Sequence, residues 1–462
     1  MPHRIRSSLA LLVCTTLSLA CHDLADTAPL IPTAVASRSD AGTDATTAAL
    51  VRQLAAARGV LPLAPAPRVR TELVRLGQVL LFDPILSGNR NISCSTCHLP
   101  AIAMGDGRSL SIGEGGVGLG PERQHPNGDF IPRNAPSLFN IGAMRHLFWD
   151  GRVQMETPGQ VITPAGAQIT PAMQRVFEFG PASALGMFPV TNRAEMRGTG
   201  GNELAAIADD DRPAMWRALM ARLGQFPEYR AFFEAAYPGT RFDDMTFAHA
   251  SNAIGGFLVD KLSTANTPWD QFLAGNDKAL TTRQLDGART FMTLKCSLCH
   301  TGPTFSDEQF HNVAVAQIGP GEGDGLSLRD DFGRMRVTGL PEDRYRFRTT
   351  PLRNVELTGP YGHSGSISSL RGFVEHYSES DVKLTDFDAM TLEPSLRGTL
   401  LLNSSDVLLQ RDEIIKGVVL TPALIDKLVD YMGALTDNAA RDLTHLVPQR
   451  VPSRLPVGQA RR

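Results

Sequence analysis

Two short stretches of the sequence combine cysteine and histidine in the same order, C-x-x-C-H. Their residues are Cys94, Cys97 and His98 in the first stretch, and Cys296, Cys299 and His300 in the second. In this pattern the two thiols bond to the vinyl groups of a haem, and the histidine ligates its iron. The composition of the chain makes two chance matches negligible. The sequence therefore predicts two covalently bound c-type haems.

Disulfide bonds and zinc are the alternatives for these cysteines. Disulfide bonds form in exported proteins, and the N-terminus predicts export, as described below. A zinc site needs further ligands at short spacing, and neither stretch has them. The histidine directly after each cysteine pair favours haem in both places.

The N-terminus predicts export from the cytoplasm. Residues 1–20 have a basic start and then an apolar run that is too short for a membrane-spanning helix. Residues 17–21 resemble a bacterial lipobox, in which Cys21 would carry a lipid after cleavage, and cleavage without lipidation is the alternative. Residues 21–48 lack apolar periodicity and predict a flexible tether, with folding starting near Ala49. We therefore expect a periplasmic protein, with a lipid on Cys21 as its membrane anchor.

Helices must position both motifs. Apolar residues recur at helical spacing in the segments that precede the motifs, residues 70–84 and 281–296. Residues 157–199 are rich in Pro, Gly and Ala and predict a loop or insertion. No sustained strand alternation is present. The sequence therefore predicts a mostly α fold of two cytochrome c-like haem domains with long loops, residues 49–262 for the first haem and 263–462 for the second.

Charge and motif context argue against two other functions. The formal net charge is −3 and no long basic run occurs, so we expect no nucleic-acid partner. GEGGVG, at residues 113–118, fits the G-x-G-x-x-G pattern of dinucleotide-binding proteins. No predicted strand precedes it and no βαβ unit surrounds it, so it predicts a loop beside the first haem.

Several longer stretches resemble the bacterial di-haem cytochrome c peroxidases and their MauG relatives. They are LFDPILSGNRNISCSTCH, PRNAPSLFNIGAMRHLFWDGR, NRAEM, LDGARTFMTLKCSLCHTGPTFSDEQFHN, FRTTPLRNVELTGPYGHSGSISSLRGFVEHY and the tail LVPQRVPSRLPVG. The resemblance covers nearly all of the chain after the tether. It implies a peroxidase that reduces hydrogen peroxide to water with electrons from a donor protein, such as a small cytochrome c or a cupredoxin.

Two other functions fit the same motifs. A MauG-like enzyme would use peroxide to oxidise residues of a partner protein, and an electron-transfer cytochrome would have no enzymatic activity. A homodimer is also compatible with the resemblance.

The resemblance implies roles for residues near the first haem. The family's distal histidine would fall at Glu114, so we expect this iron to be open to peroxide, with His125 as the alternative ligand. The family's acid, in an E-M pair six residues after a proline, matches Glu195, which we expect to move protons during O–O cleavage. A solvated loop glutamate is the alternative. Trp149 matches the tryptophan between the haems and predicts an electron relay, or simply a core aromatic residue.

The resemblance also implies the second axial ligand. Tyr377 lies where ordinary peroxidases have methionine and MauG relatives have tyrosine, and His376 and Met390 are the alternatives. A tyrosinate lowers the reduction potential of the iron relative to a thioether. We expect His363 and His311 to be buried hydrogen-bonding residues and not ligands.

Three further residues match the family's calcium ligands. They are Asn134, Thr358 and Pro360, the last two at the family's spacing before Tyr377. The resemblance therefore implies one Ca²⁺ between the two domains.

Overall fold

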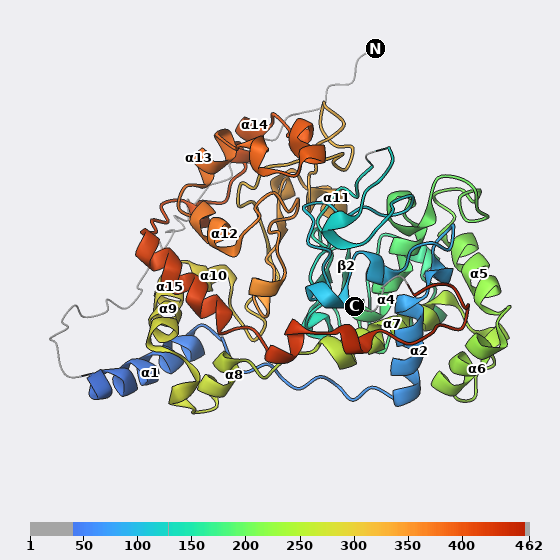
Figure 1. The fold of residues 1–462 in the computed structure, drawn as a ribbon, viewed down its shortest axis with the longest axis horizontal. Helices are drawn as coiled ribbons and strands as arrows, with labels where there is room; N and C mark the ends of the chain where they lie inside the picture. The colour runs from blue at the N-terminus through green and yellow to red at the C-terminus, as the bar shows by residue number, and fades with distance from the viewer. Residues whose placement is uncertain (1–39, 128, 458–462) are drawn as a thin grey trace, which may run out of the picture. The chain divides into compact units, whose positions relative to one another are not determined.

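The structure is a computed structural model that describes residues 40–127 and 129–457. The described chain is mostly helical (Figure 1). Its helices are α1 Asp40–Ala57, α2 Thr71–Phe82, α3 Pro171–Gln174, α4 Pro181–Ala184, α5 Arg212–Leu223, α6 Pro227–Ala236, α7 Phe247–Leu262, α8 Pro268–Leu273, α9 Thr282–Thr293, α10 Cys296–Cys299, α11 Met335–Thr338, α12 Leu370–His376, α13 Ser380–Thr385, α14 Ser404–Leu409 and α15 Pro422–Gly433. The prediction of a mostly α fold is confirmed.

Two short antiparallel pairs make up the sheet structure of the described residues. β1, His146–Leu147, pairs with β2, Val153–Gln154, and His146 lies opposite Gln154. β3, Phe310–His311, pairs with β4, Phe347–Arg348, and Phe310 lies opposite Arg348. Each pair holds together the two sides of a loop, so strands contribute local order and not a core.

The predicted export signal and Cys21 lie outside the described residues, as does the tether up to residue 39. The predicted start of folding near Ala49 is wrong, because α1 begins at Asp40. Ala48, Val51 and Ala55 share one face of α1 and are fully buried, which explains why the helix extends into the predicted tether. In the described part of the chain, no helix combines the length and the apolar character needed to cross a membrane.

The described residues form two large hydrophobic cores and two smaller clusters. The first contains the buried faces of α2, α4, α5, α6 and α7, and the second contains those of α8, α9 and α15. The buried residues of α1 belong to the second core, and apolar residues between 440 and 451 belong to the first. Figure 1 shows α1 beside α8 and α9, and the last part of the chain beside α2. The predicted domain boundary between residues 262 and 263 stays a prediction. The N-terminal segment α1 packs in the second core, and the C-terminal segment packs in the first.

Glycine residues allow the closest helix contacts in both cores. α2 packs against α7, and a Cβ atom on Gly77 would lie 1.9 Å from the carbonyl oxygen of Ala253. α9 packs against α15, and a Cβ atom on Gly287 would lie 2.0 Å from the carbonyl oxygen of Lys427. Each crossing fixes the helix that precedes a C-x-x-C-H motif, so the structure repeats the duplication in the sequence.

We expect Gly77→Ala to lower the free energy of unfolding by about 1–3 kcal/mol, because the added methyl group pushes α2 away from α7. Gly398→Ala is the matched control, since a Cβ atom there would meet nothing within 4 Å. Its cost should stay below about 0.5 kcal/mol. Urea unfolding followed by circular dichroism compares the two variants, and equal midpoints would contradict the close crossing.

Candidate haem sites

The first C-x-x-C-H motif forms a tight turn after α2. The amide nitrogen of His98 donates to the carbonyl oxygen of Cys94 over 3.1 Å. Nδ1 of His98 lies 2.9 Å from the carbonyl oxygen of Met104. Because a carbonyl oxygen only accepts, Nδ1 carries the proton, which leaves the lone pair of Nε2 available to a metal.

The second motif repeats this geometry. The amide nitrogen of His300 donates to the carbonyl oxygen of Cys296 over 3.0 Å. Nδ1 of His300 lies 3.0 Å from the carbonyl oxygen of Phe305, so Nε2 again keeps its lone pair. In both motifs a backbone carbonyl a few residues after the histidine orients the ring, as metal-binding histidines require.

The four cysteines of the motifs form no disulfide bond, so the disulfide alternative is wrong. Burial raises the pKa of Cys94 and of Cys97 to about 12, and that of Cys296 to about 11. These thiols stay neutral, unlike the thiolates of redox-active or zinc-binding pairs. One group of three metal-binding side chains occurs among the described residues, Cys299 with Asp307 and His311, and it excludes Cys296. The pattern fits covalent attachment better than zinc.

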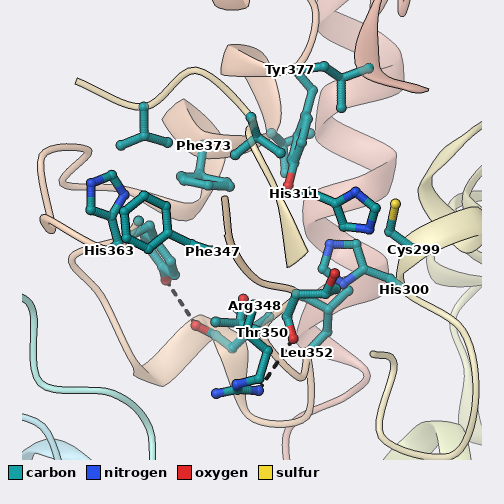
Figure 2. A pocket seen from close by; sticks show the side chains of 18 of the residues that line it. Cys299, His300, His311, Phe347, Arg348, Thr350, Leu352, His363, Phe373 and Tyr377 are labelled. Carbon is teal, nitrogen blue, oxygen red and sulfur yellow. Dashed lines mark hydrogen bonds between the residues drawn. The ribbon is translucent and has the colours of Figure 1, made fainter. Parts of the chain in front are cut away.

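A cavity of about 190 Å³ lies beside the second motif (Figure 2). The predicted site residues that line it are Cys296, Cys299, His300, Tyr377, Trp149, Asn134, Thr358 and Pro360. Phe291, Leu352, Phe373 and Met432 contribute to its largely apolar wall. An apolar cavity with two cysteines and an oriented imidazole fits a covalently attached porphyrin.

Tyr377 is the one of the three candidate axial ligands that the structure brings to this cavity. Figure 2 shows its side chain pointing into the pocket. Burial, and then the charges of Cys299 and Cys296, raise the pKa of its hydroxyl well above the ordinary value. Nε2 of His376 instead donates to a backbone carbonyl over 2.7 Å. Met390 is 63% exposed, so its thioether faces solvent.

Trp149 belongs to the first half of the chain but lines the cavity beside the second motif. Its Nε1 donates to the carbonyl oxygen of Asn134 over 2.9 Å. The side-chain nitrogen of Asn134 donates to the carbonyl oxygens of Arg108 and Ser109. Its Oδ1 therefore remains available to ligate a metal ion. Trp149 is buried and belongs to the cavity wall, as expected of a core aromatic residue, and its role as an electron relay stays a prediction.

Glu195 lies beside the first motif on a π-helical turn, Arg193–Arg197. The side chain of Asn192 caps this turn and accepts from the amide of Glu195 over 3.2 Å. Burial raises the pKa of the Glu195 carboxyl above its ordinary value, and the charge of Arg152 opposes this effect. A Cβ atom on Gly113 would lie 2.5 Å from the carbonyl oxygen of Glu195, and the carbonyl oxygen of the preceding residue, Ile112, lies 3.9 Å from Sγ of Cys97, so the turn lies beside the first motif. Single π turns are frequent at functional sites.

The glycine-rich loop lies against the turn that carries Glu195. The amide nitrogen of Glu114 donates to the carbonyl oxygen of Glu195 over 2.9 Å. The carboxylate of Glu114 accepts from the side chain of Asn91 over 3.0 Å. His125 packs on the same loop, where a Cβ atom on Gly115 would lie 2.5 Å from its Nε2. The open iron, and His125 as its alternative ligand, stay predictions.

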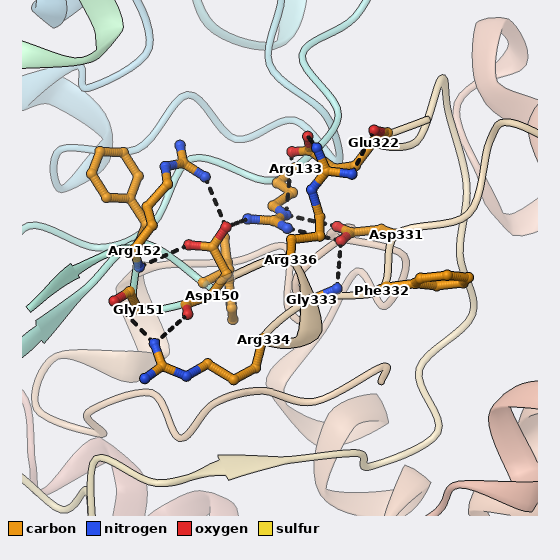
Figure 3. A network of polar contacts seen from close by, with 12 residues as sticks. Arg133, Asp150, Gly151, Arg152, Glu322, Asp331, Phe332, Gly333, Arg334 and Arg336 are labelled. Atoms are coloured by element: carbon orange, nitrogen blue, oxygen red, sulfur yellow. Dashed lines mark hydrogen bonds and ion pairs between the residues drawn. The ribbon is translucent and has the colours of Figure 1, made fainter. Parts of the chain in front are cut away.

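A buried ion-pair network joins the two halves of the chain near Glu195 (Figure 3). Arg133 contacts the carboxylate of Asp331 at 2.6 and 2.8 Å and that of Asp150 at 2.6 Å. Arg152 is a second cation on Asp150, at 3.1 Å. Burial opposes ionisation of Asp150, but the charges of Arg152 and Arg133 hold its pKa well below the ordinary value. The same two arginines favour the ionised form of Glu195.

His311 has two acidic partners that no sequence pattern predicted. Nδ1 of His311 lies 2.7 Å from the carboxylate of Asp412, and Nε2 lies 3.1 Å from that of Asp307. Burial opposes protonation, yet these contacts raise the pKa of His311 to about 11. His311 is therefore the hydrogen-bonding residue that was predicted. Asp412 lies 101 residues away in sequence, and no local pattern connects the two.

Two C-x-x-C-H turns with carbonyl-oriented histidines, held in a helical fold, define a c-type haem protein with two attachment sites. The chain matches the family model of the di-haem cytochrome c peroxidases over residues 71–278. It is 32% identical over 304 residues to the cytochrome c551 peroxidase of Pseudomonas aeruginosa, which is 65% of this chain and 69% of that protein. It is 27% identical over 392 residues to the cytochrome-c peroxidase IdrP2 of Pseudomonas sp. (strain SCT), which is 79% of this chain and 91% of that protein.

A solved structure shows the same fold. The crystal structure of a MauG-like protein associated with microbial copper homeostasis has a TM-score of 0.56 and 24% sequence identity, over 84% of this chain and 95% of that chain. The present chain belongs to the di-haem cytochrome c peroxidase family, which implies two c-type haems. It is accordingly an oxidoreductase that acts on hydrogen peroxide, and the alternative of a cytochrome without enzymatic activity does not fit.

We expect Arg133→Met to lower the free energy of unfolding by about 3–5 kcal/mol, because it leaves the buried carboxylate of Asp331 without its counter-ion and removes one of the two cations on Asp150. Arg450→Met is the matched control, since Arg450 pairs with Glu228 at the surface and exposed pairs contribute about 0–1 kcal/mol. Guanidinium chloride unfolding measures both. A loss for Arg133→Met no larger than the control's would show that the network does not hold the halves together.

Proposed function

We propose that this protein reduces hydrogen peroxide to water at the first motif, with electrons that enter through the second. When bound, the haems supply the iron that peroxide and electrons require. The observation that carries this proposal is the position of Glu195, whose turn packs on the loop that contacts Cys97 and whose carboxyl has a raised pKa. A proton-handling group next to an attachment site is what distinguishes a peroxidase site from a site for electron transfer alone.

Glu195 acts as the base and then as the acid. One carboxylate oxygen accepts a proton from hydrogen peroxide and returns it to the oxygen that leaves as water. Burial brings the pKa of the carboxyl closer to neutral pH, which suits both steps, and Arg152 keeps the ionised form accessible. The side chain of Asn192 caps the π turn and so fixes the backbone segment that carries Glu195.

We expect Glu195→Gln to slow peroxide reduction by about 10²–10⁴-fold while both haems stay attached, because the amide cannot accept the proton. Since burial raises the pKa of Glu195, the wild-type rate should fall as the pH drops through a value above that of an ordinary glutamate, and the variant should lose this dependence. Stopped-flow peroxide consumption across pH gives both results.

Glu114→Gln is the matched control for this experiment, because Glu114 lies on the adjacent loop and its carboxylate contacts Asn91. Its rate should equal that of the wild type. An unchanged rate and pH profile in Glu195→Gln would remove Glu195 from the mechanism.

We propose that Tyr377 would be the second protein ligand of the haem held by His300, and that Trp149 would carry electrons between the two sites. Both side chains line the cavity beside the second motif. An anionic tyrosinate favours the oxidised iron relative to a thioether, so this site would have a low reduction potential. A low potential suits a site that passes electrons on toward peroxide.

We expect Tyr377→Met to raise the reduction potential of the second haem, because a thioether stabilises reduced iron. Spectroelectrochemical titration measures the change. Met390→Leu serves as the control and should leave the potential unaltered, since Met390 is exposed. An identical spectrum and potential in Tyr377→Met would mean that another residue binds this iron.

Tyr377 also favours a second function, the oxidation of residues of a partner protein with peroxide. The fold neighbour with a TM-score of 0.56 is named a MauG-like protein. The two functions differ in turnover: steady peroxide consumption with a reduced cytochrome c or cupredoxin supports the first, and slow turnover with a modified partner supports the second. Mass spectrometry of candidate partners after peroxide addition distinguishes them.

Calcium, assembly and location complete the proposal. Oδ1 of Asn134 and the carbonyl oxygens of Thr358 and Pro360 are the hard oxygen donors that Ca²⁺ prefers, and all three residues line one cavity. We assign one Ca²⁺ to them. We propose the periplasm as the location, with lipidated Cys21 as a membrane anchor, and a homodimer as the assembly.

A further inference from the structure

Arg348 is a buried cation on the wall of the second cavity. It is 6% exposed, and its guanidinium donates to the carbonyl oxygens of Phe148 and Thr349, both over 3.3 Å. Among residues 40–127 and 129–457 it forms no ion pair with a carboxylate within 4.0 Å. The carboxylate that affects the pKa of Arg348 is that of Glu308. It already accepts a hydrogen bond from the amide nitrogen of His146. Arg348 therefore lacks a direct counter-ion.

Other buried arginines of this protein are better satisfied. Arg353 holds the carboxylate of Asp270 through two contacts of 2.8 Å. Arg123 also has no carboxylate partner, but it donates to three carbonyl oxygens over 2.6 to 2.8 Å. Arg348 has two long hydrogen bonds and no anion. A buried guanidinium in this state is strongly unfavourable unless a bound group supplies the charge.

His363 is a second unsatisfied group on the same cavity. It is 5% exposed, and its Nε2 has no hydrogen-bond partner. Its ring stacks on Phe347 with 3.6 Å between centroids and 8° between planes, so its orientation is fixed. Figure 2 shows His363 on the side of the pocket away from Cys299 and His300. Residues 40–127 and 129–457 provide no hydrogen-bond partner for Nε2, so the hydrogen bond predicted for His363 stays a prediction and the nitrogen is free for a bound group.

We propose that Arg348 and His363 bind the two propionate groups of the second haem. The propionates leave a porphyrin on the edge opposite the vinyl carbons that bond to the cysteines. Arg348 and His363 line the same pocket as Cys299, so one carboxylate would meet the guanidinium of Arg348 and the other would accept from Nε2 of His363. The inference rests on the proposed attachment of haem at the second motif.

This arrangement makes Arg348 a determinant of the haem's reduction potential. A carboxylate near the iron stabilises the oxidised, more positive state, and a paired cation offsets this effect. The offset is large because both charges are buried and little screened. Arg348 thus raises the potential that the rest of the site, with its assigned tyrosinate, would otherwise lower.

We expect Arg348→Gln to lower the potential of the second haem, so that the ratio of oxidised to reduced haem at a fixed potential rises at least tenfold, or 59 mV for a one-electron couple. Arg348→Lys keeps the charge and should shift the ratio less. Lys295→Gln is the matched control, since Lys295 lines the same cavity but is exposed, and its shift should stay below twofold. Spectroelectrochemical titration of the holoenzyme measures all three.

His363→Phe keeps the stacking on Phe347 and removes the nitrogen. It should alter the propionate bending modes in the resonance Raman spectrum, and it decides the question if Arg348→Gln fails to fold or to bind haem. Wild-type potentials in Arg348→Gln, equal shifts in the Gln and Lys variants, or unchanged propionate modes in His363→Phe would each overturn the proposal. A haem count of one in the wild-type protein would instead contradict the attachment on which it rests.

Discussion

One hydrogen bond in each half of the chain determines what the haem motifs can do. The Nδ1 proton of His98 is donated to the carbonyl of Met104, and that of His300 to the carbonyl of Phe305. Each bond fixes the tautomer and the plane of the ring, and so reserves Nε2 for a metal. The helices before the motifs, the close glycine crossings and the burial of the thiols keep these turns in place.

The two halves are tied together by charge as well as by apolar packing. Arg133 sits between Asp150 and Asp331, which come from opposite halves of the chain. Such buried pairs cost desolvation and require good geometry, so they fix one arrangement of the surrounding segments. Because Arg133 and Arg152 also influence Glu195, the element that joins the halves lies within electrostatic range of the proposed proton-handling group.

The second cavity combines satisfied and unsatisfied charges. His311 lies between two carboxylates, whereas within the described part of the chain Arg348 contacts only carbonyl oxygens and Nε2 of His363 has no hydrogen-bond partner. A site that binds a dianionic cofactor must keep some cationic and donor capacity unpaired within the protein chain, because internal partners would compete with the cofactor. This contrast between neighbouring groups is a property of the cavity as a whole, which no single residue reveals.

The sequence by itself determined the chemistry that depends on short spacing. The C-x-x-C-H motifs and the helix before each of them follow from residues a few positions apart, because local hydrogen bonds and side-chain periodicity specify them. Tyr377, Glu195 and Trp149 were identified through resemblance to a family. Tertiary structure alone decided which distant groups meet: Asp412 at His311, α1 in the second core, and a missing counter-ion at Arg348. The contacts of His311 and of α1 join residues a hundred or more positions apart in the sequence. The periodicity of apolar residues carries no information about such contacts.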